Sequence, residues 1–365
     1  MPAPAPAPSE AMSATDVTAI STSATTHPAL HAGIAVAERV LGGGTGRVDY
    51  MFQLALEGLL ELGKVPGQER YLHEALRLVS EALGITPATH VSWRKQPFSC
   101  LTWAAYEATG DKAWLPVFVQ ESQLMRQEIW RDADGVVLHP RGEKRGGGEA
   151  MLIDGIQEYV SRVARTGAVL GEAEWFAEGA RQMRVHRQVL RCPRTGLWSQ
   201  GRGWLGAEPM RLSPGAWSRG HGWLMRGLEH ALRSIPHECP EHAELLAYFT
   251  EIADALLDVQ HADGMWPTLL NRPADQSPPD SSGTAMIAHH MARAVRDGYL
   301  TGERYAASAA AALSALPTYV TADGVVLSAS PGPGPLEVEE PWMRRDFPPN
   351  DPHGTFALLF AAATP

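Results

Sequence analysis

The loops Thr195-Gly196-Leu197-Trp198 and Asp263-Gly264-Met265-Trp266 are two copies of a short segment that punctuates this chain. Related loops occur at Asp134-Gly135-Val136 and at Asp323-Gly324-Val325. Glycine suits such turns because it adopts a left-handed backbone without a steric penalty. The four glycines recur after 61, 68 and 60 residues. A recurrence of this length predicts a repeat architecture, in which each unit buries its apolar face against its neighbours.

Helical segments fill the intervals between these loops. Apolar residues recur there with helical spacing, and Gly and Pro residues mark the ends of about twelve segments. The predicted helices cover residues 28–41, 49–63, 69–83, 97–109, 112–130, 153–167, 172–190, 220–234, 241–260, 283–299, 303–318 and 354–363. The second, fourth, sixth and eighth are rich in small and apolar residues, whereas the helices that follow them carry more charge. We therefore predict an all-α fold, an (α/α)6 toroid of six helical hairpins with the apolar helices inside.

The composition excludes several classes of protein. The net charge of the 365 residues is −10, so the chain lacks the basic character that is typical of nucleic-acid binding. Its three cysteines are far apart and predict neither a disulfide framework nor a metal site. Residues 1–27 are rich in Pro, Ala, Ser and Thr and lack the features of a signal peptide, so we expect a disordered tail. We expect residues 28–365 to form a single domain, with no membrane partner, a cytoplasmic location and a monomeric or homodimeric state.

Polar residues lie where the chain enters the predicted inner helices. In a closed ring of hairpins these helices are parallel, so their N-terminal ends meet at one mouth. Helix N-termini favour anions, because unpaired N–H groups and the positive end of the helix dipole lie there. The sequence therefore predicts a shared anion-binding pocket at the mouth. Its candidate residues are Asp49, Trp93, Arg94, Lys95, Asp154, Arg219, Asp280, Ser282, Asp351 and His353.

The most unusual of these sites is Trp217-Ser218-Arg219-Gly220-His221-Gly222-Trp223, which leads into the eighth predicted helix. Tryptophan faces stack well on sugar rings. The planar guanidinium of Arg219 suits a carboxylate. These residue types together predict a site for a carboxylated sugar. The alternative is a capped helix whose two tryptophans, Trp217 and Trp223, belong to the core.

Asp154 lies at the start of the sixth predicted helix, in an apolar context. Burial there raises the pKa of a carboxyl group, while the helix N-terminus lowers it. A carboxyl with a pKa near neutrality can give and take a proton, which is what general acid/base catalysis needs. Helix capping is the alternative role. Arg141 precedes a run of three glycines, and this loop is interpreted as a lid over the mouth or as an ordinary loop.

The histidines fall into two groups, candidate site residues at helix starts and residues of helix surfaces or loops. His221 and His353 lie beside glycines at helix starts and are candidate acid/base or hydrogen-bonding groups. His289-His290 and the pair His237 and His242 are interpreted as residues of helix surfaces or loops. No pair has the spacing of metal ligands with a matching partner, and no phosphate-binding loop is present, so neither a metal ion nor another cofactor is expected.

The motifs of this chain resemble the unsaturated rhamnogalacturonyl hydrolases of glycoside hydrolase family 105 and, more distantly, the unsaturated glucuronyl hydrolases of family 88. The resemblance covers most of the chain after about residue 45. The motifs that carry it are Leu152-Ile153-Asp154-Gly155, Gly196-Leu197-Trp198, residues 217–223, Asp263-Gly264-Met265-Trp266, residues 281–286 and residues 350–355. The resemblance implies the (α/α)6 fold and an enzyme that removes a 4,5-unsaturated uronic acid from the non-reducing end of lyase-generated oligosaccharides.

The resemblance also implies roles for individual residues. Asp154 would protonate C4 of the enol-ether double bond and activate water for C5. The hydrated product would then open and expel the rest of the sugar chain, without direct displacement at the anomeric carbon. The candidate substrate contacts are Asp49, Trp93, Arg94, Arg141, Gln200, Trp217, Arg219, His221, Trp223, Ser282 and His353.

The chain departs from the family at several of these contacts. Arg94 and Lys95 stand where relatives usually carry an aspartate, Gln200 stands where they often have His, and His221 stands where they often have Asn. The segment after Arg141 lacks the Trp-His pair expected there. These changes affect substrate contacts more than Asp154, so they bear on the identity of the substrate more than on the class of reaction.

Three other functions fit the same pattern of residues. An inverting glycosidase needs a second carboxylate ~6.5–9.5 Å from the first, for which Asp49, Asp280 and Asp351 are candidates. A sugar epimerase on the same toroid would use a histidine pair such as His221 and His353. A non-catalytic protein that binds acidic sugars would keep the tryptophans and arginines without needing a catalytic carboxyl.

Overall fold

The computed structural model describes residues 28–43, 50–85, 100–139, 150–204, 208, 210–332 and 347–364. Within these residues it contains twelve α-helices, which match the twelve predicted segments. They are α1 (Pro28–Gly42), α2 (Tyr50–Leu62), α3 (Glu69–Ile85), α5 (Leu101–Thr109), α6 (Leu115–Glu128), α7 (Ile153–Leu170), α8 (Ala173–Leu190), α9 (Ser218–Ser234), α10 (Pro240–Leu257), α11 (Ser281–Arg296), α12 (Glu303–Ala315) and α14 (Pro352–Ala362). Two short strands, β1 (Met151–Leu152) and β2 (Gly201–Arg202), pair antiparallel, with Met151 opposite Arg202.

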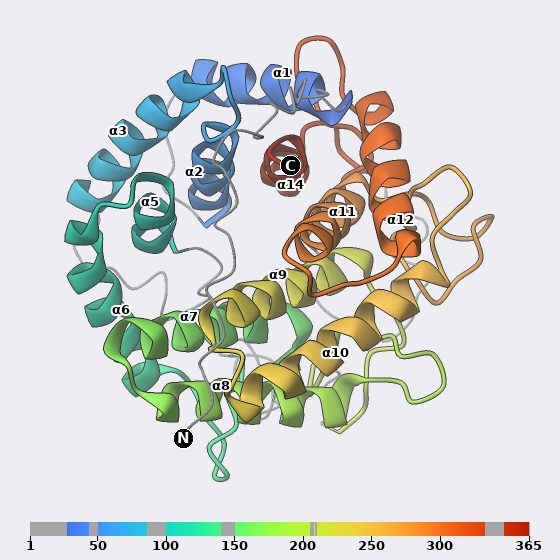
Figure 1. Cartoon of the computed structure of the whole chain (residues 1–365). Helices are drawn as coiled ribbons and strands as arrows, with labels where there is room; N and C mark the ends of the chain where they lie inside the picture. The colour runs from blue at the N-terminus through green and yellow to red at the C-terminus, as the bar shows by residue number, and fades with distance from the viewer. Residues whose placement is uncertain are drawn as a thin grey trace, which may run out of the picture.

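The helices form two concentric rings (Figure 1). The inner ring consists of α2, α5, α7, α9, α11 and α14, and the outer ring of α1, α3, α6, α8, α10 and α12. The last inner helix, α14, packs against both α1 and α2, so the C-terminal part of the described chain closes the ring onto its N-terminal part. The predicted all-α (α/α)6 toroid is confirmed.

The four repeated loops form hairpin turns around their glycines. Gly135, Gly196, Gly264 and Gly324 have φ values of 76°, 73°, 89° and 78°, in the left-handed region that favours glycine. Each turn packs against the outer helix of the following unit. The contacts are Gly135 to Arg181 of α8, Gly196 to Ala255 of α10, Gly264 to Ala311 of α12 and Gly324 to Ala35 of α1. The repeat therefore places neighbouring units against one another, and its fourth copy contacts the first helix.

The inner helices are buried on nearly all sides, and their buried faces are partly polar. On α9 every residue from Ser218 to Leu232 is buried, including Arg226 and Glu229. Small residues allow these helices to approach closely. A Cβ atom on Gly227 of α9 would lie 2.7 Å from the backbone Cα of Gln157 on α7, so only glycine fits at this crossing.

We expect Gly227→Ala to lower the free energy of unfolding by about 1–3 kcal/mol, because the added methyl group forces α7 and α9 apart. Urea denaturation measures this loss. Gly42→Ala at the end of α1 is the matched control, since an added Cβ there meets nothing within 4 Å. Equal stability of the two variants would contradict the close packing of α7 on α9.

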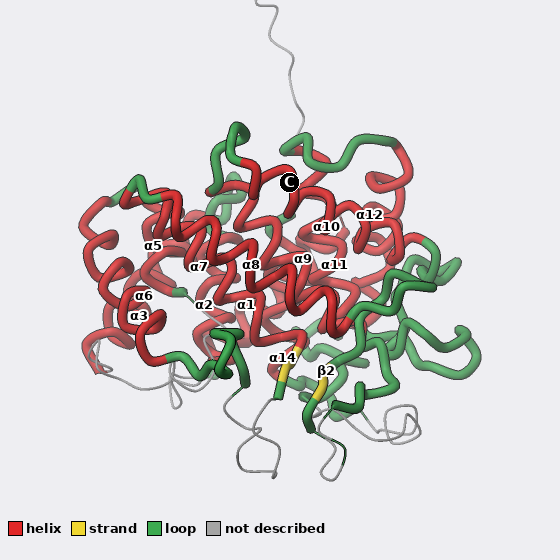
Figure 2. Tube along the Cα trace, turned by 90° about the horizontal axis from the view of Figure 1, so that it is seen from below, coloured by secondary structure: helices red, strands yellow, loops and turns green. Residues whose placement is uncertain are grey.

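The N-terminal ends of the inner helices lie at one end of the ring, together with long loops and both short strands (Figure 2). Four of the predicted contacts, Asp49, Trp93, Arg94 and Arg141, lie outside the described residues, as do Lys95 and residues 1–27. Among the described residues, no helix combines the length and apolar character that crossing a membrane requires.

Candidate active site

Asp154 is the second residue of α7, and its carboxyl group is buried. The strand pair fixes the start of this helix, since the N–H of Ile153 donates to the carbonyl of Gln200 at 2.9 Å. Leu152 is the N-cap residue and no side chain caps the helix. Asp154 Oδ1 has no hydrogen-bond partner among the described residues. Capping therefore does not explain this carboxyl group.

Burial raises the pKa of Asp154 to about 7, although the charge of Arg219 acts in the opposite direction. Such a carboxyl holds a proton near neutral pH and can also release it, as a general acid/base must. The contact between Ile153 and Gly220, where a Cβ would lie 2.8 Å from Ile153 Cγ2, brings the starts of α7 and α9 together.

Arg219 is fully buried in the first turn of α9, with one edge of its guanidinium held by the protein. Its Nη1 donates to the hydroxyl groups of Ser282 at 2.8 Å and Ser330 at 2.9 Å, and also to the carbonyl of Ser330. The guanidinium carbon lies 4.2 Å from the ring centroid of Trp217. Nε and Nη2 have no hydrogen-bond partner among the described residues. One pair of donors is thus left for a ligand, in the geometry that binds a carboxylate through two parallel hydrogen bonds.

Asp280 supports this arrangement without contacting Arg219 directly. It is the N-cap residue of α11 and is fully buried. Oδ1 accepts hydrogen bonds from the Ser282 hydroxyl at 2.6 Å and from the backbone N–H groups of Ser282, Gly283 and Ser330. Oδ2 accepts from the Ser330 hydroxyl at 2.6 Å and from the Ser218 hydroxyl at 3.2 Å. Asp280 therefore fixes the two serines that hold Arg219.

Asp351, His353 and Tyr50 form a hydrogen-bonded chain at the same mouth. Asp351 is the N-cap residue of α14, and its Oδ1 lies 2.6 Å from His353 Nδ1. His353 Nε2 lies 2.9 Å from the hydroxyl of Tyr50, the first residue of α2. Burial and the charge of Arg219 lower the pKa of His353, against the opposing effect of Asp351. A neutral His353 donates a hydrogen bond from Nδ1 to Asp351 and accepts one at Nε2 from the Tyr50 hydroxyl.

The remaining predicted contacts occupy buried positions in the fold. His221 Nδ1 lies 2.8 Å from the Trp217 carbonyl, and Nε2 accepts from the Trp198 N–H at 2.9 Å. Burial lowers the pKa of His221 to about 4, so the ring is neutral and fixes the loop at Trp198. Trp223 is buried, with its ring 5.5 Å from that of Phe356. Gln200 is buried beside the start of α7.

Several residues of the mouth were not assigned a role from the sequence. Tyr50 and Ser330 contact His353 and Arg219, as described above. Trp204 Nε1 donates to the Met151 carbonyl at 2.9 Å, and the Trp204 ring lies 4.9 Å from that of His139. These two rings lie beside the start of α7, because a Cβ on Gly155 would be 3.7 Å from His139 Cδ2. Only the position of Tyr50 at a predicted helix start was a usable signal.

The interpretation of three histidines as surface or loop residues was wrong. His289 and His290 on α11 and His242 on α10 are buried. His289 and His290 lie within the toroid because α11 belongs to the inner ring and is covered by helices on all sides. The helical spacing of the sequence did not show this, since consecutive residues cannot both lie on one narrow face.

Residues 42–364 match the family model of Glycosyl Hydrolase Family 88. A region of 171 residues is 26% identical to an unsaturated 3S-rhamnoglycuronyl hydrolase of Alteromonas sp. (strain LOR), covering 46% of this chain and 34% of that protein. The chain thus spans about a third of the length of this curated relative.

Two solved structures share the fold. A possible member of family GH105 from Klebsiella pneumoniae superposes with a TM-score of 0.74 at 20% identity, covering 92% of both chains. An unsaturated glucuronyl hydrolase from Bacillus sp. GL1, responsible for the degradation of glycosaminoglycan, superposes with a TM-score of 0.69 at 17% identity, covering 91% of this chain and 94% of that chain. At these identities the likeness establishes the toroidal fold.

Proposed function

Because this chain belongs to glycoside hydrolase family 88, we propose that it removes a 4,5-unsaturated uronic acid from the non-reducing end of lyase-generated oligosaccharides. The observation that carries this proposal is the pairing of Asp154 with Arg219 at one mouth. Asp154 supplies a buried carboxyl group with a pKa of about 7, and Arg219 supplies two buried donors without a protein partner. A planar carboxylate next to a carbon–carbon double bond matches both groups.

In the proposed reaction the substrate carboxylate binds Nε and Nη2 of Arg219, which directs C4 of the ring toward Asp154. The protonated carboxyl of Asp154 gives its proton to C4 of the enol ether. A water molecule adds to C5, and its proton passes to the Asp154 carboxylate, so the enzyme ends in its starting state. The new C5 hydroxyl belongs to a hemiketal, which opens to a ketone at C5 and a hemiacetal at C1. The hemiacetal then collapses to an aldehyde and releases the rest of the oligosaccharide as an alcohol.

The geometry supports hydration over direct displacement. An inverting glycosidase needs a second carboxylate that can act as a base. Asp280 already accepts six hydrogen bonds, and Asp351 is bound to His353, so both candidates among the described residues are engaged by the protein. The histidine pair of an epimerase is similarly engaged, since both ring nitrogens of His221 and of His353 have partners.

Incubation of the purified chain with lyase-generated unsaturated disaccharides tests the proposal. The enol ether conjugated to the carboxylate absorbs ultraviolet light, and hydration removes this absorbance. We expect the absorbance to fall and the neighbouring sugar to be released. Binding of these disaccharides without turnover would instead support a non-catalytic sugar-binding protein. Release of the neighbouring saturated sugar while the absorbance stays unchanged would support an ordinary glycosidase.

The pH dependence of turnover follows from the acid form of Asp154. Because the proton on Asp154 must be present before it is given to C4, we expect kcat/KM to be level well below pH 7. It should then fall about tenfold per pH unit as Asp154 ionises above its pKa of about 7. A pH–rate profile on an unsaturated disaccharide measures this basic limb. A profile that rises through neutral pH would contradict the assignment of Asp154 as the acid.

Four of the predicted substrate contacts lie outside the described residues. Asp49, Trp93, Arg94 and Arg141 stay predicted substrate contacts. A single catalytic domain over residues 28–365, a cytoplasmic location and a monomeric or homodimeric state also stay predictions.

A further inference from the structure

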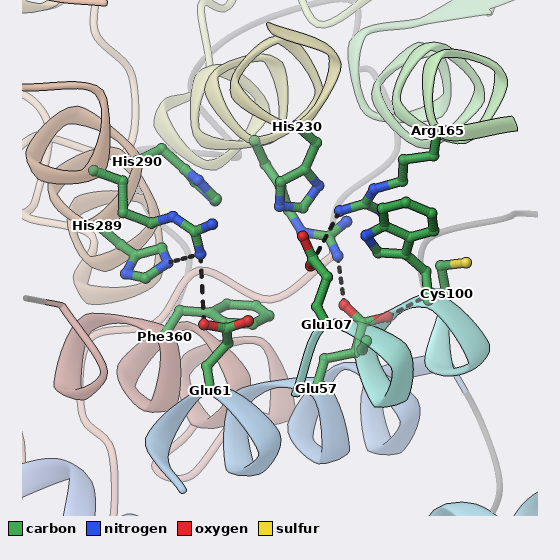
Figure 3. Close-up of a pocket in the computed structure, with 13 residues that line it drawn as sticks. Glu57, Glu61, Cys100, Glu107, Arg165, His230, His289, His290 and Phe360 are labelled. Carbon is green, nitrogen blue, oxygen red and sulfur yellow. Dashed lines mark hydrogen bonds and ion pairs between the residues drawn. The ribbon is translucent and has the colours of Figure 1, made fainter. Parts of the chain in front are cut away.

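Buried arginines elsewhere in the toroid contact a carboxylate directly. Figure 3 shows a second polar cluster, in which three guanidinium groups of the inner helices face three glutamates. The pairs are Arg226 with Glu57 at 2.5 Å, Arg293 with Glu61 at 3.5 Å and Arg165 with Glu107 at 3.8 Å. Arg219 is also buried, but it forms no direct ion pair with a carboxylate of the described residues. Its charge is therefore balanced in a different way.

Asp280 lies behind Arg219, and two serine hydroxyl groups separate the two charges. The Ser282 hydroxyl donates to Asp280 Oδ1 and the Ser330 hydroxyl to Oδ2, both at 2.6 Å. Each serine has a single hydroxyl proton, so toward Arg219 Nη1 its oxygen can only accept. Burial lowers the pKa of Arg219, and the charge of Asp280 is the largest effect that opposes this. Asp280 thus acts on Arg219 through the direction of two hydroxyl protons.

Helix capping explains only one of the two oxygens of Asp280. Oδ1 accepts from the backbone N–H groups of Ser282 and Gly283, as an N-cap residue does. The hydrogen bonds that Oδ2 accepts within the described part of the chain come from the hydroxyl groups of Ser330 and Ser218. Ser218 is the first residue of α9, and Ser330 precedes α14. Oδ2 therefore joins α11 to the two segments that position Arg219.

Ser330 links Asp280 to both aromatic and cationic parts of the mouth. Its hydroxyl oxygen accepts from Arg219 Nη1 at 2.9 Å and from Trp217 Nε1 at 3.0 Å, while its proton is given to Asp280. One donated and two accepted hydrogen bonds use the full capacity of a hydroxyl group. The Trp217 ring also lies against the guanidinium, 4.2 Å from its carbon. The direction of the Ser330 proton consequently fixes Trp217 and Arg219 together.

We infer that Asp280 is a positioning residue for the proposed hydrolysis. Through Ser282 and Ser330 it holds one edge of the Arg219 guanidinium and leaves Nε and Nη2 for the substrate carboxylate. Because it requires an acidic sugar at Arg219, this role rests on the proposed function. In this role Asp280 does not contact the substrate. Its negative charge is needed as well as its shape, since a neutral amide cannot accept hydrogen bonds at both positions.

Asp280→Asn tests this role without removing the helix cap. Asparagine is as good an N-cap residue as aspartate, so its amide oxygen can replace Oδ1. The amide nitrogen then replaces Oδ2 and donates to Ser330, whose oxygen already accepts from Trp217 and Arg219. We expect kcat/KM on an unsaturated disaccharide to fall about tenfold or more. The loss should be much smaller on an analogue in which the carboxylate is reduced to an alcohol, whereas a general distortion of the mouth would affect both substrates equally.

Two further variants separate an effect through Arg219 from loss of the fold. In the Arg219→Lys background, adding Asp280→Asn should lower kcat/KM by no more than roughly twofold, because the interaction that Asp280 supports is already lost. Ser330→Ala keeps Asp280 and the helix cap but removes one acceptor of Nη1, so it should lower the acid-to-alcohol ratio of kcat/KM in the same direction. Asp111→Asn is the matched control, since Asp111 is an exposed N-cap residue that accepts from the Ala113 N–H at 2.9 Å. It should leave the ratio unchanged.

An unchanged acid-to-alcohol ratio in Asp280→Asn would overturn the inference, and Ser330→Ala decides in the same way if Asp280→Asn does not fold. A full additional loss in the Arg219→Lys background would also overturn it, because Asp280 would then act independently of Arg219. If the wild-type chain binds the disaccharide without turning it over, the proposed function fails. The ratio of the dissociation constants for the acid and the alcohol, compared between the wild type and Asp280→Asn, then tests the role of Asp280 by itself.

Discussion

Asp154→Asn is expected to lower kcat on an unsaturated disaccharide by ~10²–10⁴-fold, the usual contribution of a positioned acid/base group. The amide has nearly the same shape as the carboxyl, so the start of α7 should keep its geometry. It cannot give a proton to C4 or accept one from water, so the chemical step is lost while substrate binding is retained. Steady-state kinetics combined with equilibrium binding separates these two effects.

The same substitution should stabilise the fold above neutral pH. The pKa of Asp154 is raised from 3.8 to about 7 on folding, so between these values the folded chain holds a proton that the unfolded chain releases. The free energy of unfolding therefore falls as the pH rises through this window. Above pH 7 the buried, ionised carboxylate continues to destabilise the folded state. Asparagine carries no such charge, so the melting temperature of Asp154→Asn should exceed that of the wild type at pH 8.

Asp134→Asn is the control for both measurements, because Asp134 is exposed in the turn at Gly135. It should change neither turnover nor stability. Near-normal turnover in Asp154→Asn would remove Asp154 from the reaction, and a lower melting temperature would mean that the ionised carboxylate has a stabilising partner.

The fold could be predicted because its determinants are local. The turns at Gly135, Gly196, Gly264 and Gly324 need a left-handed residue, and the spacing of these glycines fixes the length of each unit. Each turn then docks on the next outer helix, so a local signal repeated at a regular interval specifies the ring. The predicted starts of α9 and α11 were each two residues late, because polar residues such as Arg219 and Ser282 resemble loop residues yet occupy the first helical turn.

The site could be predicted only in part, because its contacts join distant segments. Asp154 and Arg219 stood out through unusual residues at helix starts. Ser330, which binds Arg219 from 111 residues away, is one serine in a segment rich in Ser, Pro and Gly, and nothing in the sequence connects the two. Trp223 was offered as a sugar contact, but its burial against Phe356 depends on α14 closing the ring.

The different surroundings of the Asp280 and Asp154 carboxyl groups also could not be predicted from the sequence. Sequence position alone made Asp280 as plausible a catalytic base as Asp351. In the structure the two oxygens of Asp280 are occupied by Ser218, Ser282, Gly283 and Ser330. Asp154, in contrast, has a buried oxygen without a partner among the described residues. The number of hydrogen bonds that each carboxyl accepts, which only the fold determines, distinguishes Asp280 from Asp154, the proposed acid/base.

Arg219→Lys is expected to lower kcat/KM on an unsaturated disaccharide by well over tenfold. Nη1 of Arg219 is held by Ser282 and Ser330, so the protein orients the opposite edge, Nε and Nη2, toward the ligand. A lysine keeps the positive charge but has one nitrogen, which cannot bind the serines and also meet a carboxylate with two parallel hydrogen bonds. Since ~1.4 kcal/mol corresponds to a factor of ten, the loss of one such charge-assisted bond suffices.

A substrate analogue in which the carboxylate is reduced to an alcohol distinguishes recognition from support of the loop. If Arg219 binds the carboxylate, the wild type should already turn over this alcohol analogue poorly. Arg219→Lys should then lower kcat/KM much less for the alcohol analogue than for the unsaturated disaccharide that carries the carboxylate. Arg184→Lys is the control, because Arg184 pairs with Glu244 on the outer helices and should affect neither substrate. Equal losses on the acid and the alcohol would show that Arg219 holds the start of α9 in place and does not bind the carboxylate.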